Sequence, residues 1–168
     1  MAEIAAAAEV SARTFFAYFP AKEDVLFADS AERAERLRAA LAERAPGERA
    51  IEVLRRMAGE IMPELTSRAE AEVARRRVLG RHPALAARAM HSLLAAEQEL
   101  AAGVAADLGL APGDLEPQVA ATSAISAMRA AAMAWFLAGA PAGAEPDVGA
   151  ALDLVERGLG ALPGREPD

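Results

Sequence analysis

The chain contains no cysteine, which excludes disulfide bonds and thiolate metal sites. Lysine is almost absent too, because Lys22 is the single lysine among 18 basic residues. Aromatic residues make up only 4% of the chain, and β-branched residues are sparse. We find no apolar run as long as a bilayer requires, and no signal-peptide pattern. These absences favour a cytoplasmic protein that does not enter a membrane.

Alanine, leucine, arginine and glutamate dominate instead, and these residues have high helix propensities. The sequence therefore predicts an all-α fold. Its 168 residues are enough for one compact domain, or for a small domain beside a larger one. The net charge of −7 disfavours nucleic-acid binding by the chain as a whole, so any DNA-binding surface must be local.

Prolines, glycines and capping residues divide the chain into roughly eight predicted helices and no strand. Pro63 is expected to end or kink the fourth helix, since proline removes a helical hydrogen bond. The last residues should fray. We expect the helices at about 2–8, 12–18, 22–45, 48–62, 67–79, 83–108, 115–137 and 146–162.

The most informative stretch is the start, MAEIAAAAEVSARTFFAYFPAKED. A helix of small residues leads into a tight turn at 9–11, and Ser11 can cap the short helix that follows. That second helix is too short to be stable alone, so packing through Phe15 and Phe19 must hold it. This pattern is typical of a helix-turn-helix, whose second helix enters the major groove of DNA.

The run VSARTFFAYFPAKEDVLF, residues 10–27, resembles the signature of TetR-family transcriptional regulators. It combines a serine cap, a threonine three residues later, paired aromatics, Tyr-Phe-Pro, and a Lys-Glu-Asp start to a long connecting helix. The resemblance implies a helix-turn-helix DNA-binding domain at 1–21. It also implies a helical ligand-binding and dimerisation domain at 22–168, which matches the family in the number and order of its helices.

The resemblance also implies a set of DNA-contacting residues. Arg13 can donate two hydrogen bonds to a guanine edge or one to a phosphate. A cation at a helix start opposes the helix dipole, so an external anion explains Lys22 better. Singly, these would be ordinary surface residues, and only their joint spacing favours a DNA-binding role. The implied residues are Ala12, Arg13, Thr14, Ala17, Tyr18 and Lys22, of which Thr14, Tyr18 and Lys22 contact phosphates.

Two departures from the family pattern count against DNA binding. The family turn usually carries glycine where this chain has Glu9, which would repel phosphate and lacks the easy positive φ of glycine. The family also has a further helix before this motif, and here that helix is missing. We therefore expect translation to start upstream, with a valine encoded at Met1. Without that helix the head should bind DNA poorly.

The C-terminal domain resembles, at residues 74–79 and 82–85, the subgroup described as acyl-CoA-ligand-like. This implies an apolar or acyl-type small-molecule effector. Soft apolar residues on three of the expected helices are candidates to line an elongated pocket, although each one alone would more often be ordinary core. They are Met57, Ile61, Met62, Met90, Leu94, Met128, Trp135 and Phe136.

Two further features of this domain have a predicted role. The run Arg75 to Arg77, with Arg81, is the densest positive patch, and it is either a solvated helix face or a contact for an anionic ligand head group. The helices at 116–137 and 146–162 are rich in alanine and glycine, which allow close approach. The resemblance implies that they form a four-helix homodimer interface.

No catalytic constellation is present, so we predict that the protein is not an enzyme and needs no cofactor or metal. His82 and His91 have no acidic partner at metal-ligand spacing. The leading hypothesis is a repressor that leaves double-stranded operator DNA when an apolar small molecule binds. The alternative is a helical ligand-binding or interaction protein whose DNA-reading head is too incomplete to bind operator.

Overall fold

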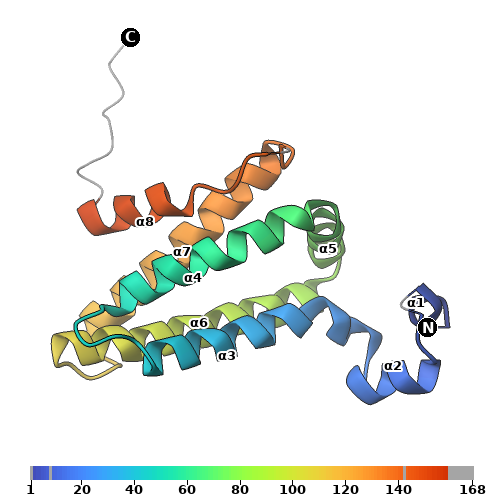
Figure 1. Cartoon of the computed structure of the whole chain (residues 1–168), viewed down its shortest axis with the longest axis horizontal. Coiled ribbons are helices and arrows are strands. Elements are labelled where there is room, and N and C mark those ends of the chain that lie inside the picture. Colours follow the sequence, from blue (N-terminus) through green and yellow to red (C-terminus); the bar gives the residue numbers. More distant parts are fainter. Residues whose placement is uncertain (1, 8, 142, 159–168) are drawn as a thin grey trace, which may run out of the picture.

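The computed structural model describes residues 2–7, 9–141 and 143–158. Within these ranges it contains α-helices, one 3₁₀ helix and no strand, which confirms the predicted all-α fold (Figure 1). In chain order the elements are α1 (Ala2–Ala7), α2 (Ala12–Tyr18), η1 (Lys22–Phe27), α3 (Ala28–Ala42), α4 (Ala50–Ser67), α5 (Ala69–Arg81), α6 (Pro83–Leu108), α7 (Leu115–Leu137) and α8 (Val148–Arg157).

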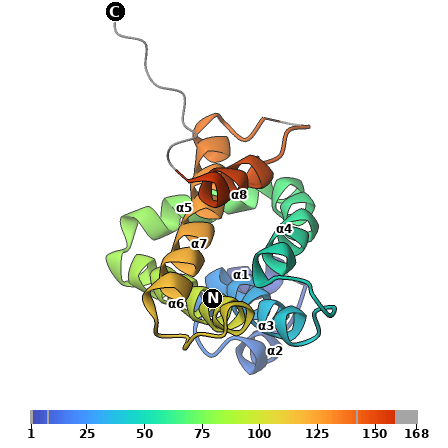
Figure 2. The same ribbon diagram turned by 90° about the vertical axis from the view of Figure 1, so that its left-hand side faces the viewer.

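The helices form a small head and a larger body. The head consists of α1 and α2 and projects from one end, and η1 connects it to the body (Figure 1). In the body, α3 lies along α6, α7 packs between α6 and α8, and α5 closes the end nearest the head (Figure 2). The head is therefore joined to the body next to α5.

The core of the body lies where α3, α4, α6, α7 and α8 meet. Val53, Leu100 and Leu152 are fully buried there, at 0% exposure. Burying one such side chain contributes about 1.5–3 kcal/mol to stability. In contrast, α5 has no buried residue, so it is the helix of the body that apolar packing holds least firmly.

The opposite end of the body is fixed by a charged side chain. The Asp107 carboxylate on α6 accepts the N–H of Ala50 at 2.7 Å and so caps the first turn of α4. The same carboxylate lies 2.9 Å from the Arg44 guanidinium, just after α3. Next to it, a Cβ on Gly103 would lie 3.0 Å from both Ala50 and Leu41, so glycine allows α6 this close approach.

Some predicted helix ends were wrong. The fourth helix does not end at Pro63 but continues to Ser67, because Ile61 and Met62 are buried and Leu65 still packs against the core. This packing outweighs the hydrogen bond that proline removes. As a consequence, α5 begins and ends two residues later than predicted.

The start of the connecting helix also differs from the prediction. Lys22–Phe27 is a 3₁₀ helix, and regular α-helix begins only at Ala28. The Asp24 carboxylate accepts the Ala21 N–H at 2.7 Å, while the Asp24 N–H donates to the Ala21 carbonyl at 3.1 Å. A 3₁₀ segment of this length is unusual and often marks a hinge.

The last two helices carry two further findings. Helix α8 begins at Val148, where Asp147 caps it by accepting the Ala150 N–H, and its predicted end at Leu162 lies outside the described residues. Among the described helices, α7 alone is long and apolar enough to cross a membrane, by length and composition only. In this structure α7 instead packs against α6 and α8.

Candidate DNA-binding head and effector cavity

The recognition helix of the head is α2, with the bounds that the sequence predicted. Its first turn is capped by Ser11, whose hydroxyl accepts the Thr14 N–H at 3.0 Å and lies 2.8 Å from the Thr14 hydroxyl. Phe15 is 5% exposed, and its ring packs against Phe19 at 5.4 Å between centroids. These contacts fix which side of α2 faces inward.

The opposite side of α2 is open to solvent. Helical spacing places Arg13, Thr14 and Ala17 away from Phe15, and all three are exposed. Tyr18 is 77% exposed on the flank of this face. Lys22 follows at the start of η1, where it lies 3.8 Å from the Glu23 carboxylate. Ala12, at the helix start, is exposed as well, so all six implied DNA-contacting residues are accessible together.

The turn between α1 and α2 confirms that Glu9 occupies a position suited to glycine. Its φ is +55°, in the left-handed region. The Val10 N–H donates to the Ala5 carbonyl and the Glu9 N–H to the Ala6 carbonyl, both at 3.0 Å. This is the Schellman pattern, in which glycine is the usual residue after the helix end. The turn is therefore formed despite a side chain that disfavours it.

Glu9→Gly should stabilise the head. A side chain in the left-handed region costs about 1–2 kcal/mol, and glycine removes that cost. Part of the gain is lost because glycine also increases the conformational entropy of the unfolded chain. Hydrogen exchange of the α1 and α2 amides should slow by roughly fivefold for a net gain of about 1 kcal/mol. Glu9→Ala is the matched control, since it removes the charge but keeps the strain. If the α1 and α2 amides were equally protected from exchange in Glu9→Gly and Glu9→Ala, the positive φ of Glu9 would not be a source of strain.

The joint between head and body is held by two arginines of the body. Arg88 on α6 donates to the Asp24 carboxylate at 2.7 Å, and its guanidinium lies 4.3 Å from the centroid of the buried Phe27 ring. The hydrogen bond from Arg88 is the main reason why the pKa of Asp24 is lowered. Arg75 on α5 donates to the Leu26 carbonyl at 3.4 Å. Both contacts fall on η1.

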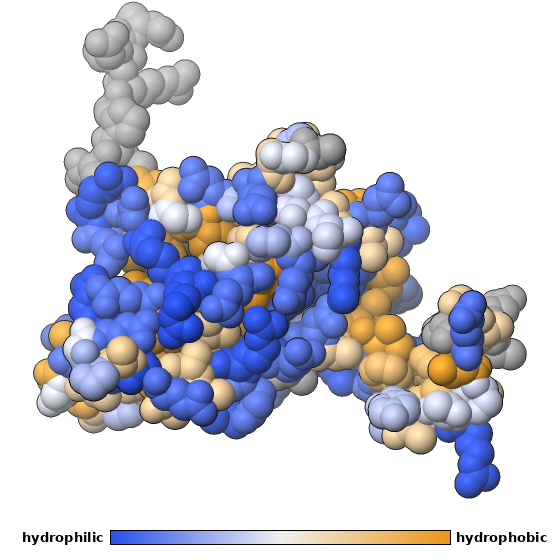
Figure 3. Space-filling model, viewed as in Figure 1, coloured by the Kyte–Doolittle hydropathy of each residue, from blue (hydrophilic) through white to orange (hydrophobic). Residues whose placement is uncertain are grey.

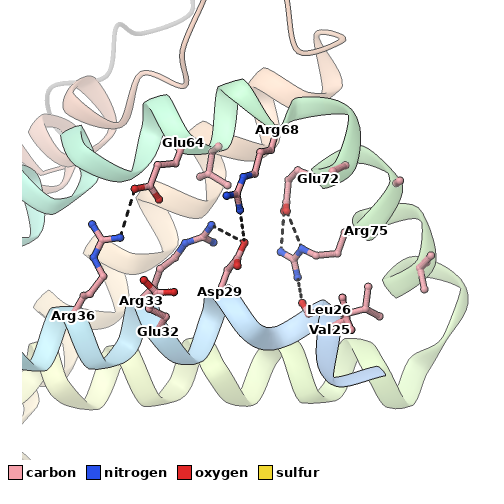
Figure 4. Close-up of a pocket in the computed structure, with 14 residues that line it drawn as sticks. Val25, Leu26, Asp29, Glu32, Arg33, Arg36, Glu64, Arg68, Glu72 and Arg75 are labelled. Carbon is pink, nitrogen blue, oxygen red and sulfur yellow. Dashed lines mark hydrogen bonds and ion pairs between the residues drawn. The ribbon is translucent and has the colours of Figure 1, made fainter. Parts of the chain in front are cut away.

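A cavity of about 630 Å³ lies between α3, α4 and α5, directly beside this joint (Figure 4). Charged contacts cross it: Asp29 on α3 lies 3.6 Å from Arg68, and Arg36 lies 3.7 Å from Glu64. Both apolar and charged residues line it. They are Val25, Leu26, Asp29, Glu32, Arg33, Arg36, Glu64, Leu65, Arg68, Ala71, Glu72, Ala74, Arg75 and Val78.

Arg75 belongs to both the cavity and the joint. The Glu72 carboxylate holds it with two hydrogen bonds of 2.8 Å, and these raise the pKa of the Arg75 guanidinium. The third nitrogen of the guanidinium, Nη1, donates to the Leu26 carbonyl (Figure 4). A displacement of α5 would therefore change a contact that fixes the head.

The residues predicted to line an apolar pocket lie elsewhere, and none of them lines this cavity. Three from α4 are buried in the core, and Met128 packs against that core. Trp135 is buried beside the half-buried Phe136, with ring centroids 4.9 Å apart. On α6, Met90 is 52% exposed and Leu94 is 48% exposed. The three buried residues of α4 are Met57, Ile61 and Met62.

A capped, exposed recognition helix on a small head, joined to a helical body with its own cavity, defines a helix-turn-helix DNA-binding regulator. Comparison with protein families agrees. Residues 1–28 match the model described as bacterial regulatory proteins, tetR family, and residues 48–160 match the MftR C-terminal domain. The second match covers more than half of the chain, so the protein belongs to the TetR family. No curated protein matches the chain.

Proposed function

We propose that the protein is a cytoplasmic homodimeric repressor that leaves its operator when a small apolar or acyl-type molecule binds the body. The observation that carries this proposal is the double role of Arg75, which lines the cavity and also holds the Leu26 carbonyl of the joint. A ligand that draws Arg75 or α5 away would loosen the head. In a dimer, that changes the geometry of the two heads and weakens operator binding.

Exposed apolar side chains on the last two helices support the dimer. Leu115 is 74% exposed, Val119 53% and Leu137 82% on α7, and Leu154 is 37% exposed on α8. Leu115 and Val119 lie one turn apart on the same face of α7, and neighbouring exposed apolar side chains of this kind are typical of an interaction site. A two-fold dimer through α7 and α8 would cover it with the same face of a second copy.

In a second candidate function, the body binds a ligand and dimerises, but the head does not recognise DNA. It is favoured by two carboxylates near the implied DNA contacts: Glu9 at the turn of the head, and Glu23 in η1, which lies 3.8 Å from the Lys22 ammonium. Both would weaken attraction to phosphate. In that case the protein is a helical ligand-binding dimer whose head does not recognise an operator.

Selection from random duplexes decides between the two functions. We expect the protein to have twice the chain mass by light scattering, and to enrich a two-fold symmetric site. Decanoyl-CoA should then release that site. Arg75→Gln should blunt the release, whereas Arg77→Gln, an exposed neighbour on the same helix, should not. Failure to enrich any sequence would favour the second candidate.

A further inference from the structure

A second arginine of α5 lies in an unusual setting, away from the cavity. The Arg76 guanidinium lies 4.2 Å from the centroid of the Phe136 ring on α7, and its Nη1 lies 3.9 Å from the Met133 sulfur. We call the surface formed by Arg76, Met133 and Phe136, together with Arg129 one helical turn before Met133 on α7, the α5–α7 seam. It joins the loosely packed α5 to α7, one of the long helices of the body.

The hydrogen-bonding capacity of Arg76 is not used up at this seam. Its Nε is buried and has no hydrogen-bond partner within the described part of the chain. A Glu72 oxygen lies 3.3 Å away, but both oxygens of that carboxylate already accept from Arg75 at 2.8 Å. An anion from solvent cannot reach the buried Nε, but the terminal nitrogens of Arg76 have only the Met133 sulfur as a partner within the described residues, so an oxygen acceptor there would be stabilising.

The local charge is positive as well. The pKa of the Arg76 guanidinium is lowered, mainly because the group is partly buried. The positive charges of Arg75 and Arg129 lower this pKa further, whereas Glu72 raises it. Arg76 thus pairs with one carboxylate, Glu72, while two other guanidinium groups lie close enough to lower its pKa. Arg129 is exposed and takes part in no ion pair that the described residues provide. An anion at the seam would relieve this repulsion.

We propose that an oxyanion, a carboxylate or a phosphate, binds at the α5–α7 seam and accepts hydrogen bonds from Arg76 and Arg129. Guanidinium groups bind such oxygens with strong, charge-assisted hydrogen bonds. The Arg76 side chain is 29% exposed and Met133 is 37% exposed, so the site opens to solvent. Phe136 and Met133 supply an apolar floor for the carbon chain of an amphipathic ligand.

The anion would also act on the joint, and this part of the inference rests on the proposed function. Arg76 neighbours Arg75, which holds the Leu26 carbonyl. Since α5 has no buried residue, a bridge from Arg76 to Arg129 would add a substantial share of what holds α5 against α7. The charged end of an effector would thus set the position of the helix that contacts the head.

The test uses the single tryptophan as its probe. Trp135 lies beside Phe136, so its emission reports on the seam without any DNA present. The protein is titrated with inorganic phosphate, sodium decanoate and 1-decanol at constant ionic strength. We expect anion-dependent changes in the parent and in Arg77→Gln. In Arg76→Gln and Arg129→Gln, the Kd should rise by roughly tenfold or more. A response to phosphate indicates a free anion, and a response to decanoate alone indicates the end group of an amphiphile.

Two results would overturn the inference: equal anion affinity in all four proteins, or no response to either anion. A loss of dimer mass in Arg129→Gln would also overturn it, because the positive charge would then face a second copy. Circular dichroism checks that each variant is folded. If Arg76→Gln does not fold, the anion affinity of Arg129→Gln tests the inference, because Arg129 is exposed. If the anion binds at the seam but operator affinity is unchanged, the anion site is supported and its coupling to the joint is refuted.

Discussion

Phe15→Ala should abolish DNA binding while the body stays folded. Phe15 is 5% exposed and packs between Phe16 and Phe19, with ring centroids 5.7 and 5.4 Å away. Removing such a ring costs about 3–5 kcal/mol. The head has only two short helices, of six and seven residues, and neither is stable without the other. The recognition face would therefore lose its fixed orientation.

The two parts of the molecule can be followed separately. Operator binding and proteolysis of the α1–α2 segment report on the head, while the thermal transition of Trp135 emission reports on the body. Phe16→Ala is the matched control, because the neighbouring ring is 46% exposed and its removal should cost little. Equal losses in the two variants, or a body that melts with the head, would contradict this assignment.

Local signals predicted the head well. Ser11, the small residues of α1 and Pro20 gave the bounds of α2, because capping and chain breaking depend on neighbouring residues alone. The positive φ of Glu9 followed from the glycine expected there. The helix bounds of the body were harder to predict where they depend on contacts between residues that are distant in the sequence. Pro63 stays inside α4 because core packing around Ile61 and Met62 holds the helix, and no local pattern reports that.

The cavity could not be predicted from the sequence for a similar reason. Arginines and glutamates spaced by three or four residues, such as Glu72 and Arg75, are typical of a solvated helix face. Only the fold brings Asp29 of α3 against Arg68, 39 positions later in the chain. The apolar residues expected in the pocket were chosen for their soft side chains, and three of them, Met57, Ile61 and Met62, are buried in the core. An apolar pocket among the others stays a prediction.

Arg13→Ala should weaken operator binding by about 1–3 kcal/mol and relax the preference for one base pair, if Arg13 donates to a guanine edge. Arg13 is exposed opposite the buried Phe15, so the change removes a contact without disturbing the head. Lys22→Ala should act differently. Its ammonium is exposed near Glu23 and would meet only phosphate, so every sequence should bind more weakly and the salt dependence should flatten.

The salt dependence separates these two roles. Anisotropy titrations of the selected operator and of a variant with one base pair changed are run over a range of salt concentrations. We expect Arg13→Ala to lose discrimination between the two duplexes, while the salt slope of Lys22→Ala falls by about one. Arg77→Ala, which removes an exposed cation of α5 outside the head, controls for net charge. If all three variants lost affinity alike on both duplexes, long-range charge alone would explain the binding, and α2 would not be reading bases.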